Sequence, residues 1–225
     1  MSDAGQVESL VTDPKLVEER RAQILKAATK LFSKQGFYRT TIQAVAKEAG
    51  ISTGLIYQYF HDKDDVLFLT LINVLEAYER EIPKALDGIS DPLEQLVRAF
   101  CAYCRIVDSL LDATVLAYRS TKSLPADRQD VIKARETATN QLLENCLAAS
   151  AQAGLVRPVN THLLVYQLVN FCHAWALKQW ALRRRYDLDE YINQGVQILI
   201  EPFLSKTGAS VLERLRNEGV VPGGR

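Results

Sequence analysis

The sequence predicts an all-α protein in which a small N-terminal helical domain is followed by a larger helical domain. Apolar residues recur at helical spacing in almost every segment of the 225 residues, and no segment alternates as a strand does. Helix start and stop signals bracket these segments. Hydrophobic residues make up 48% of the chain, which is enough for a buried core.

Four helices are predicted in the first third of the chain. They cover residues 14–35, 41–49, 52–60 and 62–86. Gly36 and Gly50 follow the first two helices, at positions where glycine commonly ends a helix. Thr41, Ser52 and Asp62 are suitable N-caps, because their side chains can accept hydrogen bonds from free backbone N–H groups.

Five more helices are predicted, covering residues 92–110, 112–123, 125–154, 161–185 and 187–205. Polar residues interrupt the most hydrophobic stretch, 163–182, so it indicates a buried helix and not a membrane span. The two domains are therefore expected over residues 14–62 and 63–205, with the helix that begins at Asp62 belonging to both. The polar residues 1–13 carry no secretion signal and are predicted to be a disordered N-terminus, and the Gly- and Pro-containing residues 206–225 a flexible C-terminal tail.

The charges are distributed unevenly along the chain. Lys and Arg number 27, as do Asp and Glu, so the net charge is zero. Between residues 14 and 63, however, nine basic and four acidic residues give +5, which leaves −5 for the remainder. This asymmetry indicates that the N-terminal part meets a polyanion.

Residues 40–67 contain two short amphipathic helices joined by the tight turn Gly50-Ile51. The small residue Ala46 lets the two helices cross closely, and their apolar faces match. This pattern predicts a helix-turn-helix, whose second helix enters the major groove of double-stranded DNA.

The positions expected to be exposed around this motif suit DNA. Hydroxyls, an amide, free N–H groups at a helix start and one ammonium group can all contact phosphates or base edges. The predicted DNA contacts are Thr41, Gln43, Ser52, Thr53, Gly54, Tyr57, Tyr59 and Lys63. Taken singly, each could be an ordinary solvated surface group; their joint occurrence inside the basic segment favours DNA contact.

The stretch GISTGLIYQYFHDKDDVL, preceded by TTIQAVAKEAG, resembles the signature of the TetR family of bacterial regulators over about residues 24–69. The resemblance implies that all the predicted DNA contacts except Ser52 fall where family members touch DNA. It also implies a helical ligand-binding and dimerisation domain. We therefore expect a homodimeric repressor that binds a palindromic operator and releases it when a small-molecule effector binds.

The helix 161–185 is apolar nearly all round, and Gly195 in the helix 187–205 would allow close backbone approach. Helices that need cover on every side predict a dimer interface, as a four-helix bundle across a two-fold axis.

Polar and aromatic residues that interrupt apolar helical faces predict the effector pocket. The candidates are Phe100, Tyr103, Tyr118, Arg119, Phe171, His173, Trp175 and Lys178. Arg119 and Lys178 are expected to be buried cations that need an anionic partner. We therefore expect a mainly apolar effector with an anionic end, with an acyl-CoA as the leading narrow candidate; residues 183–185, three arginines, could meet its phosphates. A neutral or cationic drug-like molecule is the alternative, and the aromatic residues could also simply form the core.

Cys101 and Cys104 form a CxxC, but no second pair or histidine cluster completes a zinc site, which favours a structural role over metal binding or redox sensing. Scattered cysteines without an export signal predict reduced thiols and a cytoplasmic protein. No catalytic motif is present, so neither an enzyme nor a cofactor or metal is expected. An all-helical enzyme or interaction module is the alternative class, and salt-sensitive binding to duplex DNA would discriminate against it.

Overall fold

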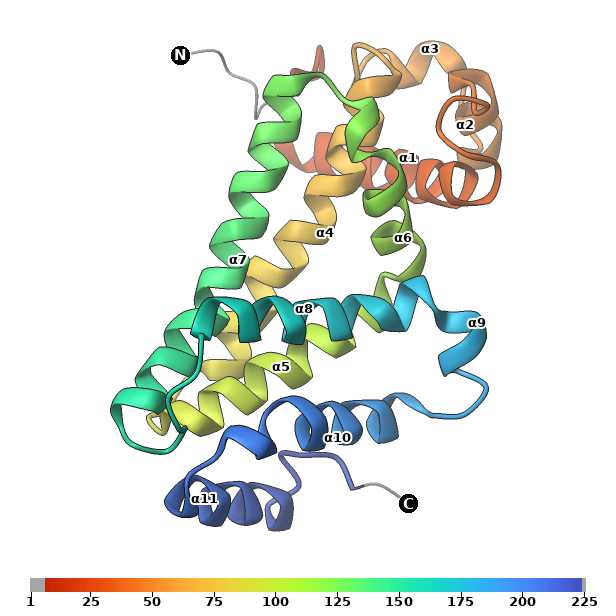
Figure 1. Ribbon diagram of the computed structural model, residues 1–225. Helices are drawn as coiled ribbons and strands as arrows, with labels where there is room; N and C mark the ends of the chain where they lie inside the picture. Colours follow the sequence, from red (N-terminus) through yellow and green to blue (C-terminus); the bar gives the residue numbers. More distant parts are fainter. Residues whose placement is uncertain (1–6, 224–225) are drawn as a thin grey trace. The chain divides into compact units, whose positions relative to one another are not determined.

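The computed structural model describes residues 7–223, which form helices joined by loops, with a single isolated β-bridge between Val156 and Leu204 (Figure 1). This confirms the all-α prediction. None of the helices within residues 7–223 combines the length and apolarity that a bilayer crossing requires.

The chain divides into two compact units, and the division falls inside two long helices. In the described residues, the first unit extends to Leu75 and includes Asp112–Arg135, and the second contains Glu76–Leu111 and all residues from Glu136 onward. Helices α4 (Lys63–Leu86) and α7 (Ala126–Gln152) therefore each contribute to both units. The division thus lies within α4, the helix that was expected to belong to both domains, and it follows Leu75 instead of residue 62.

The first unit contains the predicted N-terminal helices. They are α1 (Pro14–Gln35), α2 (Ile42–Ala49) and α3 (Thr53–Ile56), followed by the start of α4, most of α6 (Leu111–Ser120), the short η1 (Thr121–Ser123) and the start of α7. Its core is apolar and includes Ile24, Ala28, Phe32, Val45, Ile56 and Phe60, each at most 1% exposed.

The segment before α1 is held against the first unit, so the prediction of a disordered N-terminus is wrong for residues 7–13. The backbone N–H of Leu10 donates to the carbonyl of Gln58 at 2.9 Å, and the Arg21 guanidinium donates to the carbonyl of Val7 at 2.6 Å. Val7 is itself buried. The rest of the predicted disordered segment, residues 1–6, lies outside the described residues.

The second unit is built around α5 (Pro92–Ser109), which packs against three other helices of that unit (Figure 1). They are α8 (Thr161–Leu177), α10 (Leu188–Leu199) and α11 (Lys206–Asn217); α9 (Gln179–Leu182) and η2 (Glu201–Phe203) are short connecting turns. The predicted helices 161–185 and 187–205 both end early. The first stops where Lys178 leaves helical backbone angles, and the second before Pro202.

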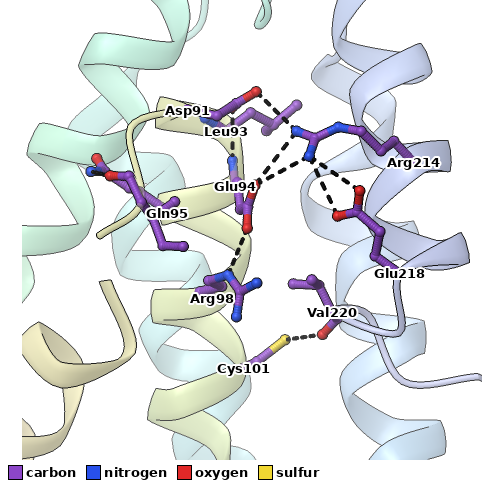
Figure 2. Close-up of polar contacts among 10 residues, drawn as sticks. Asp91, Leu93, Glu94, Gln95, Arg98, Cys101, Arg214, Glu218 and Val220 are labelled. Atoms are coloured by element: carbon purple, nitrogen blue, oxygen red, sulfur yellow. Dashed lines mark hydrogen bonds and ion pairs between the residues drawn. The ribbon is translucent and has the colours of Figure 1, made fainter. Parts of the chain in front are cut away.

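Helix α11 replaces the predicted flexible tail over residues 206–217. Its Gly208 lies so close to the Leu155 carbonyl that an added Cβ would be 2.1 Å from the oxygen, and Leu212 and Leu215 are buried. Figure 2 shows Arg214 of α11 facing the carboxylates of Asp91 and Glu94, at 3.2 and 3.4 Å. Glycine in this segment therefore permits close packing, whereas the composition alone suggested fraying.

Candidate functional site

Local residues specify the starts of α2 and α3 and the turn between them. The Thr41 hydroxyl accepts the N–H of Ala44 at the start of α2, and the Ser52 hydroxyl accepts the N–H of Leu55 at the start of α3. Gly50 has φ 71°, in the left-handed region where glycine carries no side-chain penalty. These local bonds start both helices of the helix-turn-helix, and the side chain of Gln23 in α1 adds a bond of 2.8 Å to the Ala49 carbonyl at the end of α2.

Helix α3 is shorter than predicted, and this changes the position of one candidate residue. It ends at Ile56, after which the N–H groups of Tyr59 and Phe60 both bond to the Ile56 carbonyl, at 2.9 and 3.0 Å. The resulting tight turn buries Tyr59, which is 2% exposed, beside Phe60. The expectation that the Tyr59 ring is available to DNA is therefore wrong, whereas Tyr57 is 48% exposed.

Most of the other candidate DNA contacts lie at the surface of this motif. Thr41, Gln43, Ser52 and Gly54 are exposed and Thr53 is half-buried. A Cβ added to Gly54 would meet no atom within 4 Å, so the backbone there is open to an approaching molecule.

Lys63 has a structural partner that the sequence did not reveal. Its ammonium group donates to the carbonyls of Phe37 and Thr40, at 3.0 and 3.2 Å, and lies 4.3 Å from the centre of the Phe37 ring. Two of its three N–H groups thus hold the loop between α1 and α2.

That loop carries two exposed side chains that were not among the candidates. Tyr38 is 77% exposed and Arg39 is exposed beside it, while the neighbouring Phe37 is buried. The adjacent aromatic residues Phe37 and Tyr38 were a usable signal, because only one of them anchors the loop in the core. Both Tyr38 and Arg39 extend the polar surface next to Thr41.

A buried ion pair fixes the first turn of α4. The carboxylate of Asp65 pairs with the guanidinium of Arg128 from the start of α7, and their side chains are only 5% and 18% exposed. Asp65 also accepts the backbone N–H of His61 at 2.7 Å, while Arg128 lies over the ring of Phe68. The pair explains why the start of α7 belongs to the first unit.

Five of the predicted effector residues lie on α5 and α8 in the second unit. They are Phe100, Tyr103, Phe171, His173 and Trp175. The Tyr103 hydroxyl lies 3.1 Å from His173 Nε2, and the Tyr78 hydroxyl lies 3.5 Å from the same atom. Burial lowers the pKa of His173 to about 4, so this imidazole is neutral at pH 7. Tyr78 was not among the candidates, because nothing in the sequence of α4 distinguishes it from a core tyrosine.

The aromatic side chains of this unit form a packed row. Phe171 stacks on Tyr191 with ring centres 4.2 Å apart, and Tyr191 lies 4.8 Å from Trp175. A Cβ added to Gly195 would be 2.5 Å from the Phe171 ring and 2.6 Å from that of Phe100. Gly195 therefore makes room for the chain's own core, and the expectation that it allows approach of a second backbone is wrong.

The other three effector candidates differ from expectation. Arg119 and Lys178 are exposed, so neither is a buried cation that requires an anionic partner. Their stems extend to solvent from helix ends, where a long cationic side chain can keep its charge hydrated. Tyr118, next to Arg119 on α6, is 53% exposed and belongs to the first unit.

The cysteines are buried and do not form a CxxC site. Cys104 Sγ lies 3.2 Å from Cys172 Sγ, whereas the Cys101 thiol contacts the carbonyl of Val220 (Figure 2). Burial raises the pKa of Cys101 to about 12, which disfavours the reactive thiolate. Within residues 7–223, no group of three or more His, Cys, Asp or Glu residues is placed to hold a metal ion.

Two family models match the chain. The model for bacterial regulatory proteins of the tetR family matches residues 24–69, and that for the tetracyclin repressor-like C-terminal domain matches residues 90–180. The HTH-type transcriptional regulator HbdR of Aromatoleum sp. (strain CIB) is 58% identical over 215 residues, which cover 96% of this chain and 94% of that protein. The HTH-type transcriptional repressor KstR2 of Mycolicibacterium smegmatis is 25% identical, over 74% of this chain and 82% of that protein.

Solved structures show the same fold. The structure of AibR in complex with isovaleryl coenzyme A and operator DNA has a TM-score of 0.72 at 20% identity, covering 82% of this chain and all of that one. KstR2 of Mycobacterium tuberculosis has a TM-score of 0.70 at 20% identity, over 89% of this chain and all of that one. The capped helix-turn-helix, the two family models and the 58% identical relative agree. The chain therefore belongs to the TetR family of bacterial regulators, which are DNA-binding transcriptional regulators and not enzymes.

Proposed function

We propose that the chain is a homodimeric repressor that places α2 and α3 of each subunit in the major groove of a palindromic operator. The observation that carries this proposal is the joint exposure of Thr41, Gln43, Gly54 and Tyr57 on a helix-turn-helix fixed by its own caps. The two reading motifs of a dimer would then lie about 34–36 Å apart, one turn of DNA. Lys63 mainly holds the preceding loop and contributes at most its remaining N–H to phosphate.

Base readout is tested with Gln43→Ala. An amide can bond adenine bidentately, so its removal should relax the preference at one operator position by about 1–3 kcal/mol. Sequences selected by the protein from a random duplex library would measure this. The matched control is Gln35→Ala, an exposed glutamine at the end of α1 that should leave the selected sequence unchanged. An unaltered preference for Gln43→Ala would remove this residue from the interface.

The proposed dimer uses the exposed apolar side chains of α8 and α10. Leu163 and Ile198 are 59% and 57% exposed and Tyr166 is 39% exposed, although they belong to helices whose other faces are buried. Apolar surface of this kind is stabilised when a second subunit covers it.

The double variant Leu163→Glu/Ile198→Glu should be a monomer by light scattering, because four carboxylates would be buried in a symmetric interface. The control is Leu10→Glu, a leucine 81% exposed in the first unit, which should remain dimeric. A dimeric double variant would place the interface elsewhere.

We propose that the effector is a mainly apolar molecule recognised in the second unit, and that an acyl-CoA is its class. The rings of Tyr78 and Tyr103 beside His173, in a helical unit rich in aromatic side chains, support an apolar ligand with few polar contacts. The related fold of AibR, solved with isovaleryl coenzyme A, supports the thioester. For a hundred-fold release of operator, the effector must favour the DNA-free state by about 3 kcal/mol.

Titration of the protein–operator complex with acyl-CoAs, free fatty acids and neutral aromatic compounds tests this class. Release by acyl-CoAs alone is the expected result. Release only by neutral or cationic compounds would reject the thioester and leave the DNA-binding proposal standing.

A further inference from the structure

A recess of about 470 Å³ lies on the second unit where α8 gives way to α10. Its lining includes Asp108 of α5, Trp175 of α8 and the consecutive residues Arg183, Arg184 and Arg185. The three arginines follow α9 and are exposed. Trp175 is the one residue that this recess shares with the packed row of aromatic rings.

Several other arginines of the same unit are paired with carboxylates, unlike those of the recess. Arg98 and Arg105 pair with carboxylates at 2.8 and 3.5 Å, and Arg214 contacts three acidic side chains. In the part of the chain that the structure describes, none of the arginines 183–185 forms an ion pair with a carboxylate. All three arginines line the recess, and no carboxylate within residues 7–223 occupies their donors.

The two carboxylates in the recess already have structural roles. Asp108 accepts the indole N–H of Trp175 at 2.7 Å, and Asp187 caps α10 by accepting the N–H of Glu190 at 2.9 Å. Their charges offset part of the positive charge, but three guanidinium groups against two carboxylates still leave an excess of one. The recess thus favours an anion that brings several oxygens.

Phosphate matches this arrangement better than a single carboxylate does. Each guanidinium is a planar fork of donors suited to phosphate oxygens, and three neighbouring forks can serve more oxygens than one carboxylate has. A dipole explanation is weak, because α9 has only four residues and its carbonyl end offers little charge to compensate.

Trp175 connects this recess to the apolar part of the unit. The Arg183 guanidinium lies 5.8 Å from the centre of the Trp175 ring, and the same ring packs against Tyr191 in the aromatic row. A ligand whose phosphates occupy the recess would therefore lie next to aromatic side chains.

We propose that the recess binds the phosphate groups of a coenzyme A thioester, through the guanidinium groups of residues 183–185. This inference rests on the proposed effector class. It places the nucleotide end of the acyl-CoA in the recess. The acyl end needs no charged partner in this arrangement, which agrees with the exposure of Arg119 and Lys178.

The direct test is calorimetric titration of the full-length protein with free coenzyme A. The triple variant Arg183→Ala/Arg184→Ala/Arg185→Ala should bind at least tenfold more weakly than the unaltered protein, with a smaller dependence on salt. The control Arg80→Ala/Arg216→Ala removes two paired arginines of the same unit, the first exposed and the second half-buried, and should bind as the unaltered protein does. Thermal unfolding of all three proteins shows whether each is folded.

A second measurement separates the phosphates from the acyl group. Release of operator by an acyl-CoA should need at least tenfold more ligand in the triple variant, while release by the same acyl group on N-acetylcysteamine, which has no phosphate, should be unchanged. Equal coenzyme A affinity in the folded triple variant would overturn the proposal. So would weaker operator binding by the triple variant without any ligand, because the arginines would then contact DNA.

The two proposals fail in different ways. If acyl-CoAs release no DNA from the unaltered protein, yet the triple variant loses coenzyme A binding, the recess is a phosphate site and the proposed effector is wrong. If coenzyme A does not bind the unaltered protein at all, the recess assignment itself is overturned.

Discussion

In the first unit the candidate DNA contacts Gln43 and Tyr57 are exposed, whereas in the second unit the candidate effector residues His173 and Trp175 are buried. The first two stand on helices whose caps are a few residues away. The second two depend on hydrogen-bond partners about seventy positions away in the sequence, such as Asp108 for Trp175. The difference teaches that side chains of the DNA-reading surface can be changed with little effect on folding, while those of the effector region cannot.

The largest expected effect on stability comes from leaving a buried charge of the first unit without its partner. Asp65→Ala leaves the guanidinium of Arg128 and the N–H of His61 without their acceptor, and should lower the free energy of unfolding by about 3–5 kcal/mol. Urea unfolding measures this. Glu48→Ala breaks the exposed pair with Lys30 in the same unit and should cost at most about 1 kcal/mol. Similar losses of unfolding free energy in the two variants would mean that the buried ion pair stabilises the protein no more than the exposed one does.

The second unit should lose stability in mild acid through His173. Its folded pKa of about 4 lies below the ordinary 6.5, so between these pH values the unfolded chain takes up a proton that the folded chain does not. Stability therefore falls as pH drops from about 6.5 to 4, by about 2–3 kcal/mol at pH 4.5.

Comparison with His173→Gln isolates this contribution, because glutamine does not titrate. The free energy of unfolding of the unaltered protein should fall more steeply between pH 7 and pH 4.5 than that of the variant. Parallel pH dependences would show that His173 is not buried as a neutral group.

The smallest expected effects come from the same substitution, glycine to alanine, made once in each unit. Gly195→Ala should destabilise the protein by about 1–3 kcal/mol, because its Cβ would displace the rings of Phe171 and Phe100. Gly54→Ala meets open space and should leave stability unchanged or raise it by about 0.5–1 kcal/mol, since alanine is the better helix former. Only the second should alter DNA affinity. Equal losses of stability in the two variants would contradict the difference in packing around the two glycines.

The DNA-reading motif was predictable because its determinants are local. Thr41, Gly50 and Ser52 have the cap and turn roles that their types and spacing suggested. Tyr59 was misplaced because the choice between one more helical turn and a tight turn after Ile56 depends on packing against the rest of the unit. The two structural N–H bonds of Lys63 likewise end on carbonyls more than twenty residues earlier.

The effector region was only partly predictable because helical spacing does not say which face is covered. Arg119 and Lys178 interrupt apolar faces in the sequence, yet both are exposed. Gly195 was predicted to allow close approach of another backbone, but the atoms that approach it are aromatic rings of the same chain. The buried face of α11 was missed because Gly208 was taken as a mark of flexibility.

The measurement that tests the central claim most directly is fluorescence anisotropy of a duplex selected by the protein, titrated with the unaltered chain and with Tyr57→Ala. Tyr57 is half exposed and belongs to no buried cluster, so the variant should unfold at the same temperature. Its affinity for the duplex should nevertheless fall at least tenfold, which corresponds to about 1.4 kcal/mol, and binding by the unaltered protein should weaken steeply with salt. Equal affinity of the two proteins, or no binding of duplex DNA by either, would contradict the assignment of this surface to operator recognition.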